Sequence, residues 1–282
     1  MFTRRYCIAG LTLQLESDEK IIGDPEFTSF ETDGDPDYIV RFRKVTELPP
    51  VYGEFIASWM GVEVYRDASY SIYRFQDIAQ RLYAVSRRKT GDKIITVEYL
   101  EIGAGSICHS GGAFFHIGWE DILLTNGRLI FHACCVASRL GGILFSGRSG
   151  IGKSTQGKLW CNCEGARIIN EDRPILYKEG GCWSAYGSPY AGSSKWHVNE
   201  RTEIRTIVML EQAENCSIRR LDKAEAFRRI YAQTTVENWN PKSVSYACDL
   251  TEKLASEVPV YEMACTPDRK AVELLKNILT KG

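Results

Sequence analysis

The chain has 282 residues, of which 44% are hydrophobic and 25% charged, and its formal net charge is −1. This is the composition of an ordinary globular protein, and the length suits one large domain or two modest ones. The near-zero charge argues against nucleic acid or an anionic membrane surface as a partner, and no apolar run approaches the roughly 18 residues of a membrane-spanning helix.

Ten cysteines are spread along the chain without the C-x2-C pairs of a zinc ribbon. A secreted disulfide scaffold is not expected at this length, and the N-terminal stretch does not have the pattern of a signal peptide. We therefore expect a cytoplasmic protein with small buried thiols. Metal binding by Cys161 and Cys163, which are spaced C-x-C, is the alternative.

Residues 1–108 are predicted to form a β-rich accessory region. Turn signals such as Asp33-Gly34 and Gly91-Asp92 separate its β-branched and aromatic runs, and no long helical period occurs. The runs cover residues 6–15, 38–45, 61–67, 70–75, 81–88 and 93–102. We expect an antiparallel β layer without a catalytic cluster.

Residues 109–282 are predicted to form a second domain that mixes strands and helices. A helical stripe covers residues 113–125, a helix begins at Lys153, Asp222 caps another helix, and an amphipathic helix with Pro267 near its start ends the chain. Strands are expected over residues 129–137, 141–146, 166–170, 173–178, 205–212 and 259–265. The order of these elements indicates an α/β (α+β) fold with a mixed sheet.

The stretch GRSGIGKST, residues 147–155, matches the P-loop (Walker A) pattern G-x-x-x-x-G-K-[ST] at every constrained position. Its glycines let successive N–H groups point into one concavity, and the helix that follows adds the positive end of its dipole. Lys153 supplies a cation for the β- and γ-phosphates, and Ser154 supplies a hydroxyl for Mg²⁺. A glycine-rich turn without a ligand is the alternative, but a buried strand before the loop and a helix after it favour nucleotide binding. The predicted nucleotide-binding residues are Gly147, Ser149, Gly150, Ile151, Gly152, Lys153, Ser154 and Thr155.

Two acidic residues, Glu171 and Asp172, follow the predicted strand 166–170. Carboxylates at a strand end beside a P-loop hold Mg²⁺ or activate the attacking group. An ordinary turn also carries such pairs, but beside a complete P-loop pattern we favour a functional site.

His132 lies in the apolar run 129–137, which we expect to pair with the strand that leads into the P-loop. A core histidine satisfied by the backbone is the common case. The expected pairing would bring the end of this strand to the phosphates, so we include His132 with Glu171 and Asp172 as a catalytic candidate. His109 and His116 are interpreted as structural.

Three stretches together resemble the kinase domain of HPr kinase/phosphorylase and its HPr-kinase-related relatives. They are residues 129–155, 168–177 and 258–279, and the resemblance covers roughly residues 125–280. This family's fold resembles the nucleotide domain of ATP-dependent phosphoenolpyruvate carboxykinase. The resemblance therefore implies ATP as the phosphoryl donor and Mg²⁺ as the cofactor.

The resemblance also implies roles for individual residues. His132 stands where the family has a strand histidine, Glu171 and Ser154 would hold Mg²⁺, and Asp172 would activate a serine hydroxyl. The long glycine-bearing signature that follows the acidic pair in true HPr kinases is not found, so we expect an acceptor other than HPr. The candidate acceptor-binding residues are Ser188, Lys195, His197 and Asn199, which lie in the segment that resembles the family's Gly/Ser-Pro loop, and Arg173.

Three functions remain open on the sequence. The first is an ATP-dependent kinase that transfers the γ-phosphoryl group to a hydroxyl of a peptide or protein serine or of a small molecule. The second is a nucleotide-sensing regulatory or partner-binding module with little turnover. The third is a nucleotide-hydrolysing switch, against which stands the lack of an N-K-x-D base-specificity motif. A homo-oligomer is compatible with each of them.

Overall fold

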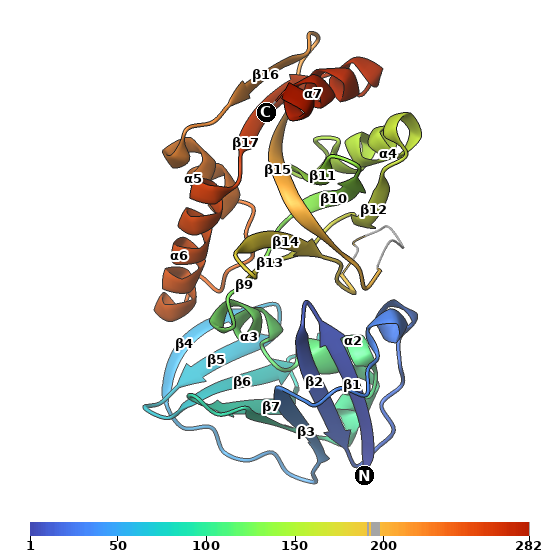
Figure 1. Ribbon diagram of the computed structural model, residues 1–282. Helices are drawn as coiled ribbons and strands as arrows, with labels where there is room; N and C mark the ends of the chain where they lie inside the picture. The colour runs from blue at the N-terminus through green and yellow to red at the C-terminus, as the bar shows by residue number, and fades with distance from the viewer. Residues whose placement is uncertain (191, 193–197, 282) are drawn as a thin grey trace. The chain divides into compact units, whose positions relative to one another are not determined.

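The structure of the chain is a computed structural model that describes residues 1–190, 192 and 198–281. Its chain divides into two compact units, Met1–Trp119 and Glu120–Gly282, both drawn in Figure 1. Within the described residues, no helix is long and apolar enough to cross a membrane.

The first unit is built on one eight-stranded sheet with the order β1-β2-β3-β8-β7-β6-β5-β4. Its strands are β1 (Phe2–Ile8), β2 (Leu11–Ser17), β3 (Tyr38–Lys44), β4 (Glu54–Trp59), β5 (Val62–Arg66), β6 (Tyr70–Gln76), β7 (Leu82–Lys89) and β8 (Ile94–Tyr99). The expectation of a purely antiparallel layer is wrong, because β3 pairs in parallel with both β2 and β8. The chain between β2 and β3 runs back through the short helix η1 (Pro25–Phe30), so β3 enters the sheet in the same direction as β2.

The first unit extends beyond residue 108, the end that the sequence suggested for the β-rich region. Its remaining helices are η2 (Glu101–Gly103), α1 (Ala104–Ile107) and α2 (Ser110–Phe115). The hydroxyls of Ser110 and Tyr6 lie 2.5 Å apart, and the ring of Phe114 contacts Tyr6 and Phe27. Residues 109–119 therefore complete the hydrophobic core of this unit.

The second unit contains a nine-stranded mixed sheet. Its strands are β9 (Arg128–Ile130), β10 (Ala133–Ser138), β11 (Gly141–Ser146), β12 (Arg167–Asn170), β13 (Ile175–Glu179), β14 (Cys182–Tyr186), β15 (Arg201–Gln212), β16 (Ser217–Arg220) and β17 (Val260–Cys265). Strands β11, β15 and β17 are parallel, and β10 is antiparallel to both β11 and β12. The ends of β11 and β12 and the start of β10 therefore meet at one edge of the sheet.

Helices cover both faces of this sheet, as Figure 1 shows. The helices on its faces are α4 (Lys153–Glu164), α5 (Lys223–Tyr231), α6 (Pro241–Glu257) and α7 (Arg269–Lys281), and the short helix α3 (Trp119–Thr125) precedes β9 in the chain. On one face, Phe145 packs with Trp160 of α4 and Leu275 of α7. On the other face, Leu144 belongs to the cluster that includes residues of α5 and α6. Leu144 and Phe145 are neighbours in β11 and point to opposite faces of the sheet, as strand geometry requires.

Two elements expected from the sequence are each divided in the structure. The helix expected over 113–125 is α2 and α3, because His116 closes α2 as its C-cap. The strand expected over 129–137 is β9 and β10, and the break falls at Phe131 and His132. At this break the backbone pairs with the chain that follows α5, where Phe131 bridges Thr234.

Candidate functional site

The loop of residues 147–152 joins the end of β11 to the start of α4. Gly150 and Gly152 adopt φ values of +76° and +110°, which L side chains rarely adopt. No atom of the described residues lies within 4 Å of an ideal Cβ at either position, so the backbone conformation, and not the available space, favours glycine there. The turn places the N–H groups that begin α4 at the edge of the sheet where β12 also ends.

A cavity of about 340 Å³ opens at this edge. It is lined by three glycines and seven polar side chains from four segments of the second unit: His132, Ser149, Gly150, Gly152, Lys153, Ser154, Thr155, Glu171, Asp172 and Gly192. The sequence-predicted loop, acidic pair and histidine are therefore brought together around one space. The sheet topology causes this, because β10 lies between β11 and β12 and starts at the edge where both of these strands end.

The ammonium of Lys153 lies in the wall of this cavity. Its Nζ donates to the carbonyl oxygens of Gly147 and Arg148 at 3.1 and 3.3 Å. Burial lowers the pKa of Lys153, and the nearby carboxylate of Asp172 opposes this shift. Because both carbonyl acceptors are neutral, an anion in the cavity would be a stronger partner for this cation.

Glu171 presents a buried carboxylate to the same cavity. The residue is 6% exposed, and its Oε1 has no hydrogen-bond partner among the described residues. Among the described residues, Nζ of Lys158 pairs with this carboxylate, at 3.9 Å from Oε1. A buried carboxylate oxygen without a hydrogen bond is costly unless a cation compensates for it. Glu171 and the neighbouring Ser154 hydroxyl therefore fit a hard divalent cation such as Mg²⁺.

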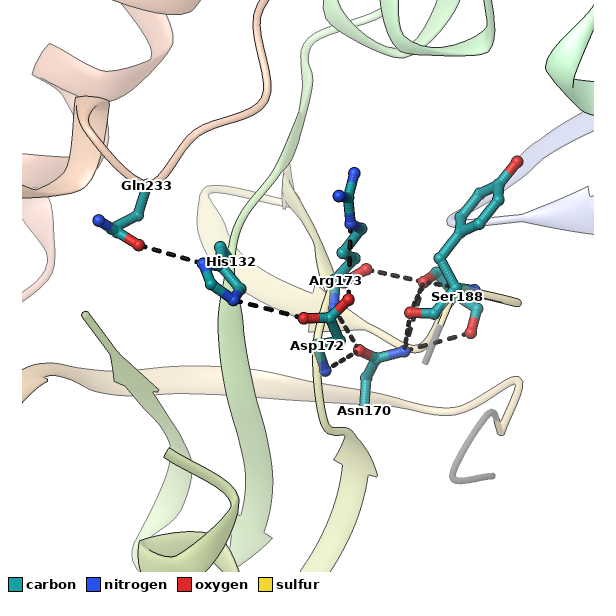
Figure 2. A network of polar contacts seen from close by, with 7 residues as sticks. His132, Asn170, Asp172, Arg173, Ser188 and Gln233 are labelled. Atoms are coloured by element: carbon teal, nitrogen blue, oxygen red, sulfur yellow. Dashed lines mark hydrogen bonds and ion pairs between the residues drawn. The ribbon is translucent and has the colours of Figure 1, made fainter. Parts of the chain in front are cut away.

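Asp172 lies between a histidine and an arginine, as Figure 2 shows. Its Oδ1 is 3.4 Å from Nε2 of His132, and its Oδ2 is 3.5 Å from Nε of Arg173. The Asp172 side chain is 28% exposed, so its carboxylate is accessible from the cavity. The arrangement offers a carboxylate that can take up a proton beside the loop.

His132 is fixed by contacts from separate segments. Its backbone N–H donates to the carbonyl of Gln233 at 2.8 Å, and its own carbonyl accepts from the Ser146 hydroxyl at 2.7 Å. Burial lowers the pKa of His132, the charge of Lys153 lowers it further, and Asp172 opposes both. The sum of these influences favours the neutral imidazole.

The turn that carries the acidic pair is held by Asn170, which the sequence analysis did not single out. The Asn170 side chain is buried, and its Oδ1 accepts from the backbone N–H groups of Asp172 and Arg173 at 2.9 and 2.7 Å. Its Nδ2 donates to the carbonyls of Ser188 and Tyr190. The signal in the sequence was a polar residue that ends an apolar strand. Figure 2 shows the hydrogen-bond network that Asn170 forms.

Some of the other sequence-predicted residues line the cavity and others do not. Of the eight loop and helix residues, Gly147 and Ile151 do not line the cavity: the Gly147 carbonyl accepts from Lys153, and Ile151 packs into the core. Ser188 is fully buried and donates its hydroxyl to the Arg173 carbonyl at 2.7 Å, which favours support of the turn over contact with an acceptor. Arg173 and Asn199 are exposed, whereas Lys195 and His197 lie outside the described residues.

Two further residues of the site were also absent from the sequence-based predictions. Gln233 contacts the His132 ring from a position 101 residues further along the chain, and no local pattern marks it. Gly192 lines the cavity, and an ideal Cβ there would be 3.1 Å from Cγ of Asp172. A side chain at this position would therefore press on the carboxylate.

Comparisons with known proteins give limited information. No family model and no curated protein matches the sequence. Among solved structures, the Hpr(Ser) kinase/phosphatase from Coxiella burnetii is similar, with a TM-score of 0.35 and 13% sequence identity over 54% of this chain and 97% of that chain. These values describe a distant structural relation, so we base the function on the residues of the site itself.

Proposed function

We propose that the second unit binds a nucleoside triphosphate, with ATP as the expected donor, and transfers its γ-phosphoryl group to a hydroxyl acceptor. The observation that carries this proposal is the convergence of four features on one cavity: the loop 147–152, Lys153, the buried Glu171 and the accessible Asp172. A cation, a helix N-terminus and two carboxylates of different exposure are the groups that phosphoryl transfer needs.

The phosphates would lie against the loop. The N–H groups at the start of α4 and the Lys153 ammonium would share the negative charge of the β- and γ-phosphates. Ser154 and Glu171 would hold Mg²⁺, which neutralises phosphate charge when it is bound. Thr155 and Ser149 line the same cavity and would add hydroxyl donors.

Asp172 would act as the general base. It would take the proton of the acceptor hydroxyl while the hydroxyl oxygen bonds to the γ-phosphorus and the bond from the γ-phosphorus to the leaving nucleoside diphosphate breaks. Arg173, whose side chain is 48% exposed beside this carboxylate, would contact the acceptor. The acceptor is a peptide or protein serine or a small alcohol.

Nucleotide binding is tested by titration calorimetry with MgATP. Lys153→Ala should weaken MgATP binding at least about tenfold, because a charge-assisted contact to phosphate is worth roughly 1.5–3 kcal/mol. Lys270→Ala, on the exposed face of α7, is the matched control and should bind as the wild type does. Unchanged MgATP affinity in folded Lys153→Ala protein would remove the phosphate site.

Transfer is tested separately. Wild-type protein is incubated with γ-labelled MgATP and pools of serine-containing peptides, amino acids, inositols and sugars, and products are identified by mass. A phosphorylated acceptor supports the kinase. Tight MgATP binding without a phosphorylated product would instead favour the nucleotide-sensing module.

A further inference from the structure

Among the described residues, each ring nitrogen of His132 has a polar neighbour, and the two neighbours differ in kind. Nδ1 lies 3.2 Å from Oε1 of Gln233, and Nε2 lies 3.4 Å from Oδ1 of Asp172. Both facing atoms are oxygens that accept hydrogen bonds. A neutral imidazole carries one N–H, so it can donate to one of these oxygens and must present a lone pair to the other.

The distances favour a proton on Nδ1. The contact with Gln233 is within hydrogen-bond range, whereas 3.4 Å exceeds the usual range for an N–H donor and a carboxylate oxygen. With the proton on Nδ1, the Nε2 lone pair faces Asp172. This pairing leaves no hydrogen bond between His132 and Asp172 while the carboxylate is ionised, in agreement with the longer separation.

We propose that Gln233 is a positioning residue that fixes the Nδ1–H tautomer of His132, so that Nε2 can accept the proton which Asp172 removes from the acceptor hydroxyl. The inference rests on the proposed function. The proton passes from the hydroxyl to Asp172 and from Asp172 to Nε2 of His132. The resulting imidazolium donates to Gln233 through Nδ1 and returns the proton to water, because the His132 side chain is 34% exposed.

Backbone hydrogen bonds hold the segment that carries Gln233. The N–H of Gln233 donates to the Ile230 carbonyl at 2.9 Å at the end of α5, and its carbonyl accepts from the N–H of His132. The N–H of Thr235 donates to the Ile130 carbonyl at 3.0 Å. The segment after α5 is therefore paired on both sides of the His132 break, which sets the Gln233 side chain beside the imidazole (Figure 2).

Other groups besides Gln233 also affect the pKa of the His132 ring. Lys153 lowers the pKa of His132, as does Arg173 to a smaller extent, and burial has the largest effect in that direction. Asp172 and the Gln233 hydrogen bond raise the pKa. A substitution at Gln233 changes one of these influences and leaves the others in place.

The tautomer is measured by NMR of protein labelled with ¹⁵N in its histidine rings, at a pH above the pKa of His132. The His132 signal is assigned from the spectrum of His132→Gln. We expect the Nδ1–H form in the wild type and in Gln233→Glu, which keeps an acceptor oxygen. Gln233→Met has similar length but replaces the amide oxygen with a thioether sulfur, which is only a weak acceptor. The His132 ring in this variant should therefore change to the Nε2–H form and donate to Asp172.

These spectra decide the inference without any enzyme assay. An Nε2–H ring in the wild type, or an Nδ1–H ring retained in Gln233→Met, would overturn it. Ala232→Met is the matched control, because it introduces the same side chain one residue away at an exposed position. This control should leave the His132 signal and the thermal unfolding temperature unchanged.

The kinetic consequence is tested with an acceptor identified for the wild type. Gln233→Met should lower kcat by up to about a hundredfold, as misplacement of a proton-transferring group does, with little change in KM for MgATP. Gln233→Glu should retain more activity and shift the pH profile toward higher pH, because a second carboxylate stabilises the imidazolium. A wild-type kcat in Gln233→Met with the altered tautomer would refute the relay. Absence of transfer by the wild type would instead count against the proposed function, while the spectra would still report the tautomer.

Discussion

Replacement of Asp172 by asparagine separates nucleotide binding from phosphoryl transfer. Asp172→Asn keeps the size of the side chain and removes its basicity. Because general-base catalysis contributes about 10²–10⁴-fold, we expect transfer to fall by at least about a hundredfold. At 1.36 kcal/mol for each tenfold change, this loss corresponds to roughly 3 kcal/mol or more of transition-state stabilisation.

The same substitution should change nucleotide affinity little. Lys153, the loop N–H groups and the cation would still hold the phosphates, and loss of a negative charge beside them removes repulsion. Stability should also change little, because the contact between Asp172 and Arg173 is partly exposed and such pairs contribute about 0–1 kcal/mol. We therefore expect MgATP affinity within about tenfold of the wild type, in the direction of equal or tighter binding.

The assay compares MgATP titration calorimetry with initial rates of transfer to an acceptor verified for the wild type. Asp249→Asn is the control, since it makes the same chemical change at an exposed position of α6. Wild-type transfer by Asp172→Asn would refute the assignment of the base. Loss of binding in parallel with transfer would show that Asp172 acts on the nucleotide and not on the acceptor.

Three further predictions address the metal, the packing and the pH dependence of stability. Glu171→Gln should raise the Mg²⁺ concentration needed for half-maximal nucleotide binding by about tenfold or more, because one charged ligand becomes neutral; an unchanged Mg²⁺ titration would contradict the cation site. Gly157→Ala should destabilise the second unit by about 1–3 kcal/mol despite the better helix propensity of alanine, since its Cβ would lie 2.5 Å from Sγ of Cys134. Urea denaturation measures this loss, and Cys134→Ala in the same chain should recover part of it; a gain of stability in Gly157→Ala alone would show that the packing is looser. Burial lowers the pKa of His116 from 6.5 to about 4. Between these two pH values the unfolded chain binds a proton at His116 that the folded chain does not bind. The free energy of unfolding should therefore fall by roughly 3 kcal/mol as the pH drops from 6.5 to about 4. His116→Gln should flatten that part of the curve measured by denaturation at fixed pH values, and an equally steep curve would assign the dependence to other groups.

Local sequence patterns predicted the parts of the site that are continuous in the chain. The loop 147–152 depends on glycines and on the strand and helix next to it, which are all encoded within a few residues. The acidic pair after β12 follows from the end of an apolar run. The cap of α5 was predicted for the same reason, and Asp222 accepts from the N–H of Glu225 as part of a complete capping box.

Elements whose burial comes from distant neighbours were missed or misread. The edge strand β4 has exposed residues at both ends, and the buried face of α6 includes the polar residues Ser243 and Thr251. Neither element was expected from the sequence. The run 129–137 reads as one strand, but pairing of Phe131 with Thr234 interrupts it. The parallel pairs of the first sheet likewise depend on the path of the chain between strands, which period-two patterns do not encode.

Only the tertiary structure decided which side chains face one another in the site. The sequence placed His132, Glu171 and Asp172 near the P-loop pattern. It contained no sign of Gln233 beside His132, and it did not show that the Asn170 side chain would hold the turn with the acidic pair. These contacts arise because β10 runs antiparallel to both β11 and β12, while the chain after α5 returns to the start of β10. Strand direction and long-range pairing, and not local residue spacing, set the distances between the reacting groups.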